Sequence, residues 1–314
     1  MHKVGLVFSG QGAQYVGMGR DLHKHFQTVK DVFAEAREVL GFDIASLCFD
    51  GPQEDLDLTV NTQTTILTVD IAAYKVFEEE VGVRPVAMAG LSLGEYSALY
   101  AAEAVDLADV LALVYARGQC HKEAISTGAG CMAAIIGLSK GQVEKICHDI
   151  SQNNCVVSAA IFNTPEQIVI SGYSTAVEEA MTRAKEEGAR GVTKLSVSVP
   201  CHCSLLDKAA DMFEANLDQV ELKDCEIPVI PNSNPELFHS KDNTKELLVK
   251  QINSPVRWQE TIEKMAKMGI DTIVEIGPKR ILSGLVRRID NNIQVLNVED
   301  TSSLGKTMEF FNGR

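Results

Sequence analysis

The sequence predicts an α/β protein built on a parallel sheet, with a smaller subdomain inserted into it. Two continuous apolar runs, Val4–Gly10 and Val86–Gly90, each end in glycine and lead toward sequence that favours helices. Such runs are typical of strands buried on both faces of a parallel sheet. Between about 128 and 198, predicted strands and helices alternate as β-α-β-β-α-β, the order of a ferredoxin-like unit. After Pro200 the parallel α/β pattern resumes.

Length and composition agree with this fold class. The chain has 314 residues, which fits one large domain or one domain that carries an insert. Hydrophobic residues make up 45% and charged residues 23%, as in globular proteins with a substantial core. The first apolar run is too short for a secretory signal, and no run approaches the roughly 18 residues of a membrane-spanning helix. We therefore expect a large domain from 1–127 and 199–314, an inserted subdomain at 128–198, and no membrane association.

Hydrophobic periodicity predicts the elements of the large domain. A Gly/Gln turn and then a helical stretch past Asp21 follow the first strand. Apolar residues recur at helical spacing in Asn61–Glu80, which predicts a long helix there. Pro85 precedes the second strand, and helix formers follow it. The later part of the domain is expected to contain helices at 204–216 and 254–268, strands at 227–235 and 271–277, and a surface loop at 236–245.

Turn and cap residues divide the insert. Asn163–Glu166 has the composition of a turn, and Ser139 is suited to cap a helix. These signals predict strands at 131–137, 156–162, 167–172 and 192–199, and helices at 139–150 and 174–187.

Cysteine usage and charge exclude several classes of protein. None of the eight cysteines forms a C-x-x-C pair, so we expect buried reduced thiols and a cytoplasmic location. The formal net charge is −14, and no Lys/Arg-rich block stands out, which argues against a nucleic-acid partner. An acidic partner must therefore meet a local basic patch on this chain.

The segment Gly90-Leu91-Ser92-Leu93-Gly94 matches the G-x-S-x-G nucleophile elbow. Its position strengthens the match, because it lies between a predicted buried strand and a predicted helix. Glycine at both ends is needed where the backbone is tightly folded. A helix N-terminus at Ser92 would favour developing negative charge. The alternative is an ordinary strand-to-helix turn without chemistry.

A second turn, Gly10–Gln14, follows the first strand. It is not a dinucleotide fingerprint, because Tyr15 stands where G-x-G-x-x-G requires glycine. A turn there can direct the Gln11 N–H at a substrate carbonyl. Together with the N–H of Leu93, it would form the two-donor oxyanion hole that acyl transfer needs.

A serine nucleophile also needs a general base, and the chain has seven histidines. His121 is possible, because it lies one helical turn after Arg117. We favour His202, which lies where the chain re-enters the large domain. The rival interpretation of Cys201-His202-Cys203 is a metal site, but in an extended segment the cysteines face away from the histidine, and no second ligand pair exists.

Seven segments together resemble the malonyl-CoA:acyl carrier protein transacylase family, the loading enzymes of fatty acid and polyketide synthesis. The resemblance covers essentially the whole chain, in the family's order and spacing. The segments are FSGQGAQYVGMG (8–19), AGLSLGEYSAL (89–99), Arg117-Gly118, NTPEQIVISG (163–172), VPCHCSLL (199–206), QINSPVRW (251–258) and EIGPKRILSGL (275–285).

The resemblance implies a hydrolase-like α/β core, malonyl-CoA as substrate, and an acidic, phosphopantetheinylated acyl carrier protein as partner. We expect no cofactor and no metal, and the size of the core suits a monomer. The implied catalytic residues are Ser92 as nucleophile and His202 as base, with the oxyanion hole from Gln11 and Leu93. The backbone carbonyl of Gln251 would orient His202, Arg117 would bind the malonyl carboxylate, and Gln63 and Asn163 would contact the substrate.

The chain also departs from the family pattern. Leu91 replaces a usual histidine, and Cys201 stands where serine is common. Thr64-Thr65 replaces Pro-Ala, and Asn232-Ser-Asn replaces Asn-Val-Thr. These differences bear on rate and on the preference for malonyl over other acyl groups.

Two other functions fit parts of the sequence. A serine thioesterase or other hydrolase would use the same elbow. A non-catalytic carrier-binding protein would lack Ser92 or His202, and both are present. The clearest basic cluster of the chain consists of Lys279, Arg280, Arg287 and Arg288. We expect this cluster to dock the carrier or the CoA phosphates. The alternative is a solvated helix face without a binding role.

Overall fold

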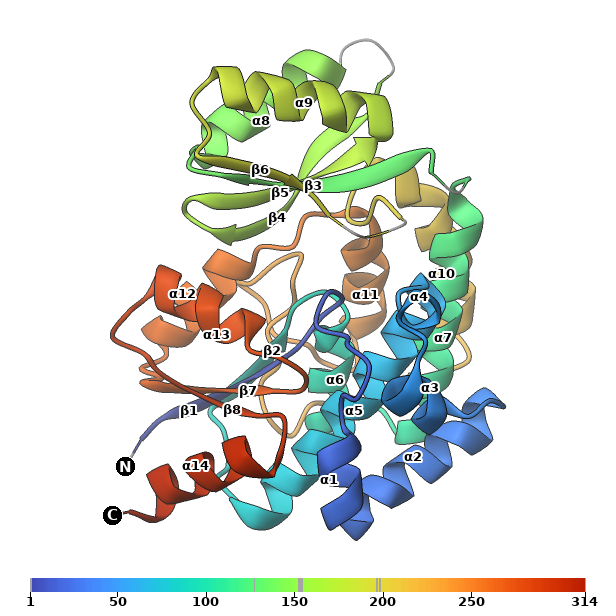
Figure 1. Cartoon of the computed structure of the whole chain (residues 1–314), viewed down its shortest axis with the longest axis vertical. Coiled ribbons are helices and arrows are strands. Elements are labelled where there is room, and N and C mark those ends of the chain that lie inside the picture. Colours follow the sequence, from blue (N-terminus) through green and yellow to red (C-terminus); the bar gives the residue numbers. More distant parts are fainter. Residues whose placement is uncertain (1, 127, 152–154, 196, 198, 314) are drawn as a thin grey trace.

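Two four-stranded sheets organise the part of the chain that the computed structural model describes, residues 2–126, 128–151, 155–195, 197 and 199–313 (Figure 1). The larger sheet is parallel with strand order β2-β1-β7-β8, and the smaller is antiparallel with order β4-β5-β3-β6. The predicted α/β class, a parallel core with a ferredoxin-like insert, is confirmed. The exact domain limits at 128 and 198 remain a prediction.

Helices separate the parallel strands, and the antiparallel sheet interrupts them in the middle of the chain. In order, the elements are β1 (Val4–Phe8), α1 (Arg20–His25), α2 (Gln27–Leu40), α3 (Ile44–Asp50), α4 (Gln53–Leu56), α5 (Thr59–Glu80), β2 (Ala87–Gly90), α6 (Gly94–Ala101), α7 (Leu107–Ala124), β3 (Gly130–Ile136), α8 (Lys140–Ser151), β4 (Val157–Thr164), β5 (Gln167–Tyr173), α9 (Ser174–Glu186), β6 (Gly191–Lys194), a 3₁₀ turn (Ser204–Leu206), α10 (Asp207–Leu217), α11 (Thr244–Asn253), α12 (Trp258–Lys267), β7 (Thr272–Ile276), α13 (Ile281–Ile289), β8 (Gln294–Val298) and α14 (Thr301–Asn312).

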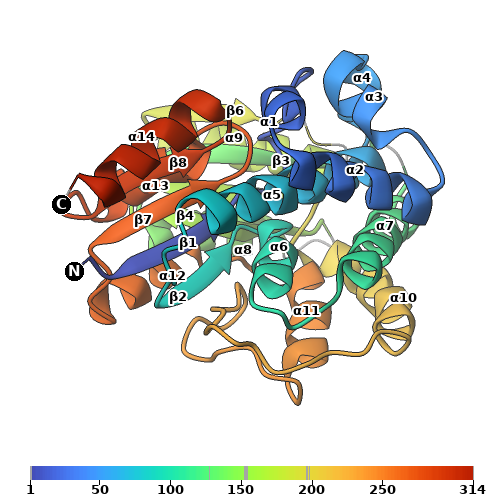
Figure 2. The same ribbon diagram turned by 90° about the horizontal axis from the view of Figure 1, so that it is seen from below.

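The parallel sheet is buried on both faces, as its continuous apolar strands require. Leu6 and Phe8 of β1 pack with α5 and α6 in one apolar core. Val7 points to the other face, where it packs with Trp258 of α12 and Leu285 of α13. Figure 2 shows α5 and α6 beside the sheet. This packing leaves the carboxyl ends of β1 and β2, where the two glycine turns begin, facing the small sheet.

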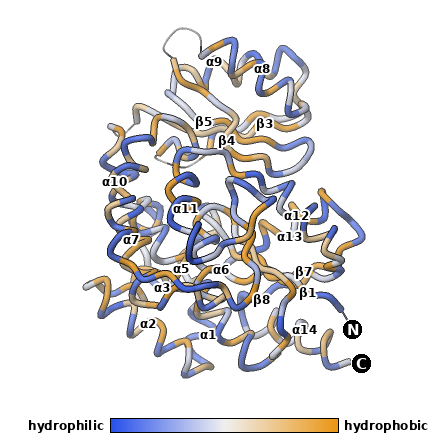
Figure 3. Tube along the Cα trace, turned by 180° about the vertical axis from the view of Figure 1, so that it is seen from behind, coloured by the Kyte–Doolittle hydropathy of each residue, from blue (hydrophilic) through white to orange (hydrophobic). Residues whose placement is uncertain are grey.

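The small sheet has its own core. Helices α8 and α9 cover its outer face, where Ile135 and Ile170 are buried (Figure 1). Its other face carries Ala134 and Val169 and is turned toward the large domain. Figure 3 shows apolar stretches along the strands, whereas polar and apolar residues alternate along α8 and α9. The space between the two sheets is therefore bounded mainly by apolar side chains.

Proline explains two differences from the predicted elements, the later start of one helix and the loss of one strand. The helix predicted at 254–268 begins only at Trp258, since Pro255 favours an extended backbone before it. Val256 instead pairs with β4, with its N–H donating to Ala160 O at 2.9 Å. The strand predicted at 227–235 is a single bridge between Val229 and Met88, because the prolines on either side lack an N–H to extend it.

Other boundaries differ by smaller amounts. The strand predicted at 192–199 is β6, which ends at Lys194; Ser196 and Ser198 lie outside the described residues. β4 continues through Thr164, so the predicted turn at 163–166 is shorter than expected. Strand β8 was not predicted.

No helix in the described ranges is long and apolar enough to cross a membrane.

Candidate active site

The sharp turn between β2 and α6 presents Ser92 at the edge of the parallel sheet. Ser92 has a φ of 55°, which is unusual for a residue with a side chain. A Cβ on Gly90 would lie 1.8 Å from the carbonyl carbon of Gly94, and one on Gly94 would lie 2.3 Å from the carbonyl oxygen of Phe8. Only glycine fits at these positions, so the motif is a structural requirement of this turn.

Ser92 and His202 form a hydrogen-bonded pair. Oγ of Ser92 lies 2.8 Å from Nε2 of His202, although the residues are far apart in sequence. Nδ1 of His202 lies 2.8 Å from the carbonyl oxygen of Gln251, which can only accept, so Nδ1 carries the proton. Nε2 therefore presents its lone pair to the serine hydroxyl. The structure thus brings together three of the residues that the sequence analysis selected.

The imidazole of His202 is held neutral. Its burial, and second the charge of Arg117, lower the pKa of His202 to about 4, although the hydrogen bond to Gln251 opposes this effect. The other candidate base, His121, does not contact Ser92. It is buried on α7, with Nδ1 3.5 Å from Nε2 of Gln63.

Arg117, on α7, is buried beside this pair and is only 2% exposed. Nη1 donates to Oε1 of Gln63 at 2.7 Å. Nη2 donates to Oγ of Ser92 and to Oε1 of Gln251, both at 3.1 Å. No carboxylate among the described residues forms an ion pair with this guanidinium. A buried cation without an acidic partner is a site for an anion.

The Gly10–Gln14 turn lies directly against the serine turn. A Cβ on Gly10 would lie 2.4 Å from the carbonyl oxygen of Leu91, so the two backbones touch. Within the described chain, the backbone N–H groups of Gln11 and Leu93 have no hydrogen-bond acceptor. Two free N–H donors near a nucleophile are the requirement for an oxyanion hole.

Asn232 is a residue of the site to which the sequence analysis gave no role; it was named only as the first residue of the Asn-Ser-Asn segment. Its Oδ1 accepts from the backbone N–H of Ser92 at 2.6 Å, and its Nδ2 donates to the carbonyl of Gly90 at 2.7 Å. The side chain thus stabilises the strained turn on both sides of Leu91. The sequence signal that could have indicated a role for Asn232 is its position in a short polar segment between Pro231 and Pro235.

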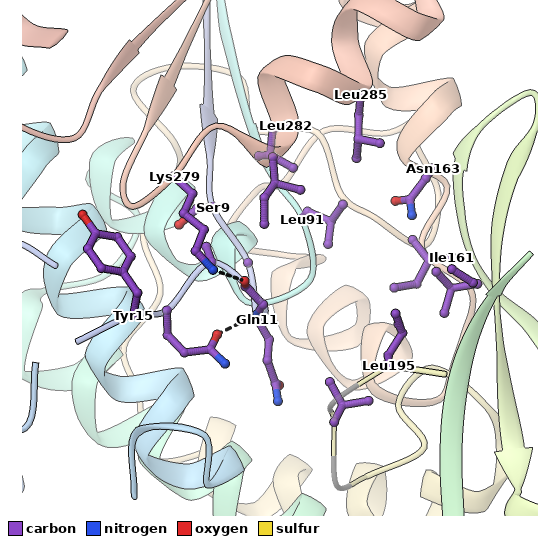
Figure 4. Close-up of a pocket in the computed structure, with 18 of the residues that line it drawn as sticks. Ser9, Gln11, Tyr15, Leu91, Ile161, Asn163, Leu195, Lys279, Leu282 and Leu285 are labelled. Atoms are coloured by element: carbon purple, nitrogen blue, oxygen red, sulfur yellow. Dashed lines mark hydrogen bonds between the residues drawn. The ribbon is translucent and has the colours of Figure 1, made fainter. Parts of the chain in front are cut away.

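A cavity of about 560 Å³ opens between the two sheets next to the serine turn (Figure 4). Gln11 and Leu91 line it on the large-domain side and Asn163 on the small-sheet side, whereas Ser92, His202 and Arg117 do not. Oδ1 of Asn163 is buried without a partner among the described groups. Asn163 therefore lines this cavity, and its Oδ1 forms no hydrogen bond with the Ser92–His202 pair.

The cysteines on either side of His202 face different surroundings. Sγ of Cys203 donates to the carbonyl of Pro200 at 3.2 Å, and Sγ of Cys201 lies 3.8 Å from Nδ1 of His121. Among the described residues, no group of three or more His, Cys, Asp or Glu side chains is arranged to hold a metal ion.

Comparison with known proteins agrees with this geometry. The acyl transferase domain family matches residues 6–309. The malonyl CoA-acyl carrier protein transacylase of Escherichia coli (strain K12) is 38% identical over 309 residues, which cover 98% of this chain and 100% of that protein.

Two solved structures are similar over nearly their whole length. The malonyl CoA-acyl carrier protein transacylase from Coxiella burnetii has a TM-score of 0.95 and 38% identity, covering 98% of this chain and 97% of that one. A malonyl-transacylase in complex with its type II PKS acyl-carrier protein has a TM-score of 0.96 and 40% identity, covering 98% and 99%. The chain therefore belongs to the malonyl CoA-acyl carrier protein transacylase family of acyl transferases.

Proposed function

We propose that this chain moves the malonyl group from malonyl-CoA to the phosphopantetheine thiol of an acyl carrier protein, through an ester on Ser92. The observation that carries this proposal is the buried guanidinium of Arg117, 3.1 Å from the hydroxyl of Ser92 and without an acidic partner in the described chain. A malonyl thioester brings a free carboxylate to that position. Family membership supports the same activity.

The geometry suits a two-step transfer. Nε2 of His202 takes the proton of Ser92 as Oγ attacks the thioester carbonyl, and the N–H groups of Gln11 and Leu93 stabilise the oxyanion. His202 then protonates the departing CoA thiolate, which leaves malonyl-Ser92. In the second half His202 takes the proton of the carrier thiol, whose sulfur attacks the ester, and returns a proton to Ser92. One histidine serves as base and as acid in both halves.

The first experiment is denaturing intact mass after brief mixing with malonyl-CoA, alone and with a phosphopantetheinylated carrier protein. We expect a malonyl adduct on the enzyme that disappears as malonyl-carrier forms. The rival thioesterase function predicts that water removes the adduct equally fast with and without carrier. If no adduct forms at all, the site does not perform acyl transfer from malonyl-CoA.

The pKa of His202 predicts how the first half-reaction depends on pH. The base must be unprotonated, and its pKa is lowered from 6.5 to about 4. We therefore expect kcat/KM for malonyl-CoA to stay level from neutral pH down to about pH 5 and to decline only near pH 4. An inflection at 6.5 or above would contradict this environment for His202.

The same shift affects stability. The unfolded chain protonates His202 near pH 6.5, whereas the folded chain does so only near pH 4. The folded state therefore loses stability as pH falls through this window, and the free energy of unfolding must be measured beside the kinetics.

The predicted basic cluster lies next to the cavity. Lys279 lines the cavity, and its Nζ donates to the carbonyl of Gly12 at 3.1 Å (Figure 4). Arg288 donates to Oε1 of Gln167, another lining residue, at 2.9 Å. Arg280 and Arg287 are exposed. A positive rim beside the entrance supports docking of an acidic carrier at this edge.

Reversing two charges of this rim tests the docking surface. We expect Arg287→Glu with Arg288→Glu to raise the apparent KM for the carrier at least about tenfold at low salt, because steering is electrostatic. The effect should fade as salt increases. Lys30→Glu with Arg37→Glu, two exposed positions on α2, changes the net charge equally and serves as the control. Equal KM values for both double variants would place docking elsewhere.

A monomeric state and a cytoplasmic location stay predictions.

A further inference from the structure

Glu95, on α6 just after the serine turn, is a charged residue of the molecule that the proposed mechanism does not use. Its side chain and that of His239 are both fully buried, and Oε1 of Glu95 lies 2.8 Å from Nε2 of His239. Nδ1 of His239 lies 3.1 Å from the hydroxyl of Thr244, the first residue of α11. One carboxylate oxygen is therefore linked to the beginning of α11.

The other carboxylate oxygen reaches both halves of the active site. Oε2 of Glu95 accepts from the backbone N–H of Asn232 and from Nε2 of Gln251, each at 2.9 Å. Asn232 supports the serine turn, as described above. Gln251 lies near the end of α11 and contributes its backbone carbonyl to His202. Glu95 thus connects the turn that carries the nucleophile with the helix that orients the base.

The contact with Gln251 also determines which way its amide points. The carboxylate oxygen of Glu95 can only accept hydrogen bonds. The carbonyl oxygen of Ser92, which lies 2.9 Å from Nε2 of Gln251, can also only accept. The amide nitrogen of Gln251 must face these two acceptors. Its Oε1 therefore faces Arg117 and accepts a hydrogen bond from Nη2 of that residue at 3.1 Å. The reversed amide would place N–H donors against the guanidinium. The direction of the Gln251 amide therefore fixes one of the side-chain acceptors that orient Arg117.

We propose that Glu95 is a positioning residue that sets the preference for a malonyl group, by fixing the Gln251 amide and through it the Arg117 guanidinium. This inference rests on the proposed function, because it concerns the orientation of the carboxylate-binding residue. Glu95 acts by the reach of its acceptor oxygen, so an amide of the same length can replace it. A shorter carboxylate cannot, although it keeps the charge.

Three variants separate reach from charge. Glu95→Gln keeps an acceptor at the position of Oε2 and removes the charge. Glu95→Asp keeps the charge but is one methylene too short to bond both Asn232 and Gln251. Glu95→Met keeps the length and removes every acceptor. For each variant we would measure kcat/KM with malonyl-CoA and with acetyl-CoA, together with thermal unfolding.

The ratio of the two kcat/KM values is the diagnostic quantity. A smaller folded fraction lowers both kcat/KM values by the same factor, whereas a misplaced Arg117 loses its contact with the substrate carboxylate and therefore lowers the malonyl-CoA value more than the acetyl-CoA value. We expect Glu95→Gln to keep the wild-type ratio and Glu95→Asp to lower it about tenfold, with a loss of about 100-fold for Glu95→Met if it folds. The comparison of the glutamine and aspartate variants is decisive even if the methionine variant does not fold.

The matched control is Glu275, another fully buried glutamate, whose oxygens accept from the backbone N–H groups of Leu282 and Ser283. Glu275→Asp is expected to lower the unfolding temperature without changing the ratio. A wild-type ratio in Glu95→Asp, or a loss in Glu95→Gln with retention in Glu95→Asp, would overturn the inference. Failure of the wild-type enzyme to transfer malonyl groups would instead contradict the proposed function.

Discussion

Alanine in place of Ser92 is expected to abolish the malonyl adduct and to lower transfer to the carrier by about 10⁴-fold or more. The hydroxyl of Ser92 is 2.8 Å from Nε2 of His202, and no other described hydroxyl is bonded to that nitrogen. The substitution removes the nucleophile but not the turn, because the strained backbone depends on Gly90 and Gly94. Intact mass after mixing with malonyl-CoA, and the rate of malonyl-carrier formation, measure the two effects.

His202→Ala is the informative companion. The two residues act as one unit, so the double variant should be no slower than either single variant. Losses that multiplied in the double variant would show that Ser92 and His202 act independently. A persistent adduct in Ser92→Ala would place the nucleophile elsewhere.

Arg117→Ala is expected to reduce malonyl transfer far more than acetyl transfer. A malonyl carboxylate that enters this buried site without its guanidinium partner is left unpaired, which costs about 3–5 kcal/mol. That corresponds to a loss of about 150- to 5,000-fold in kcat/KM for malonyl-CoA. Acetyl-CoA brings no charge, so its transfer does not depend on this pairing.

Arg117→Lys is the conservative control. Lysine keeps a positive charge but cannot make two parallel hydrogen bonds to a carboxylate, so we expect an intermediate loss. Both variants should be compared at equal amounts of folded protein, since Arg117 also bonds Gln63 and Gln251. Equal losses for malonyl-CoA and acetyl-CoA would contradict a role in carboxylate binding.

The parts of the site that sequence reasoning found are those with local signals. The turn at Ser92 was predictable because two glycines and an adjacent apolar strand report a close backbone approach, which the structure contains. The links from Asn232 and His239 to Glu95, which follows the serine turn on α6, were not predictable. They join groups 137 to 144 positions apart, and such contacts leave no periodic pattern in a single sequence.

The same distinction applies to the fold. Buried strands such as β1 and the alternation within the insert follow from hydrophobic pattern, so the class could be predicted. The strand expected at 227–235 shows the limit, because apolar residues there pack in the core while prolines prevent a ladder. Strand β8 is the edge of the sheet, and its mixed burial gives a weak signal.

The proximity of Arg117 to His202 has a consequence for how the enzyme tells its substrates apart. The positive charge of Arg117 is one cause of the low pKa of His202. A carboxylate paired with that guanidinium cancels much of its field, so the imidazole becomes more basic when a dicarboxylic acyl group arrives. A neutral acyl group leaves the histidine a weak base. If Arg117 binds the substrate carboxylate as proposed, we expect the substrate's negative charge to make His202 a stronger base, so that selectivity arises in the proton transfer as well as in binding.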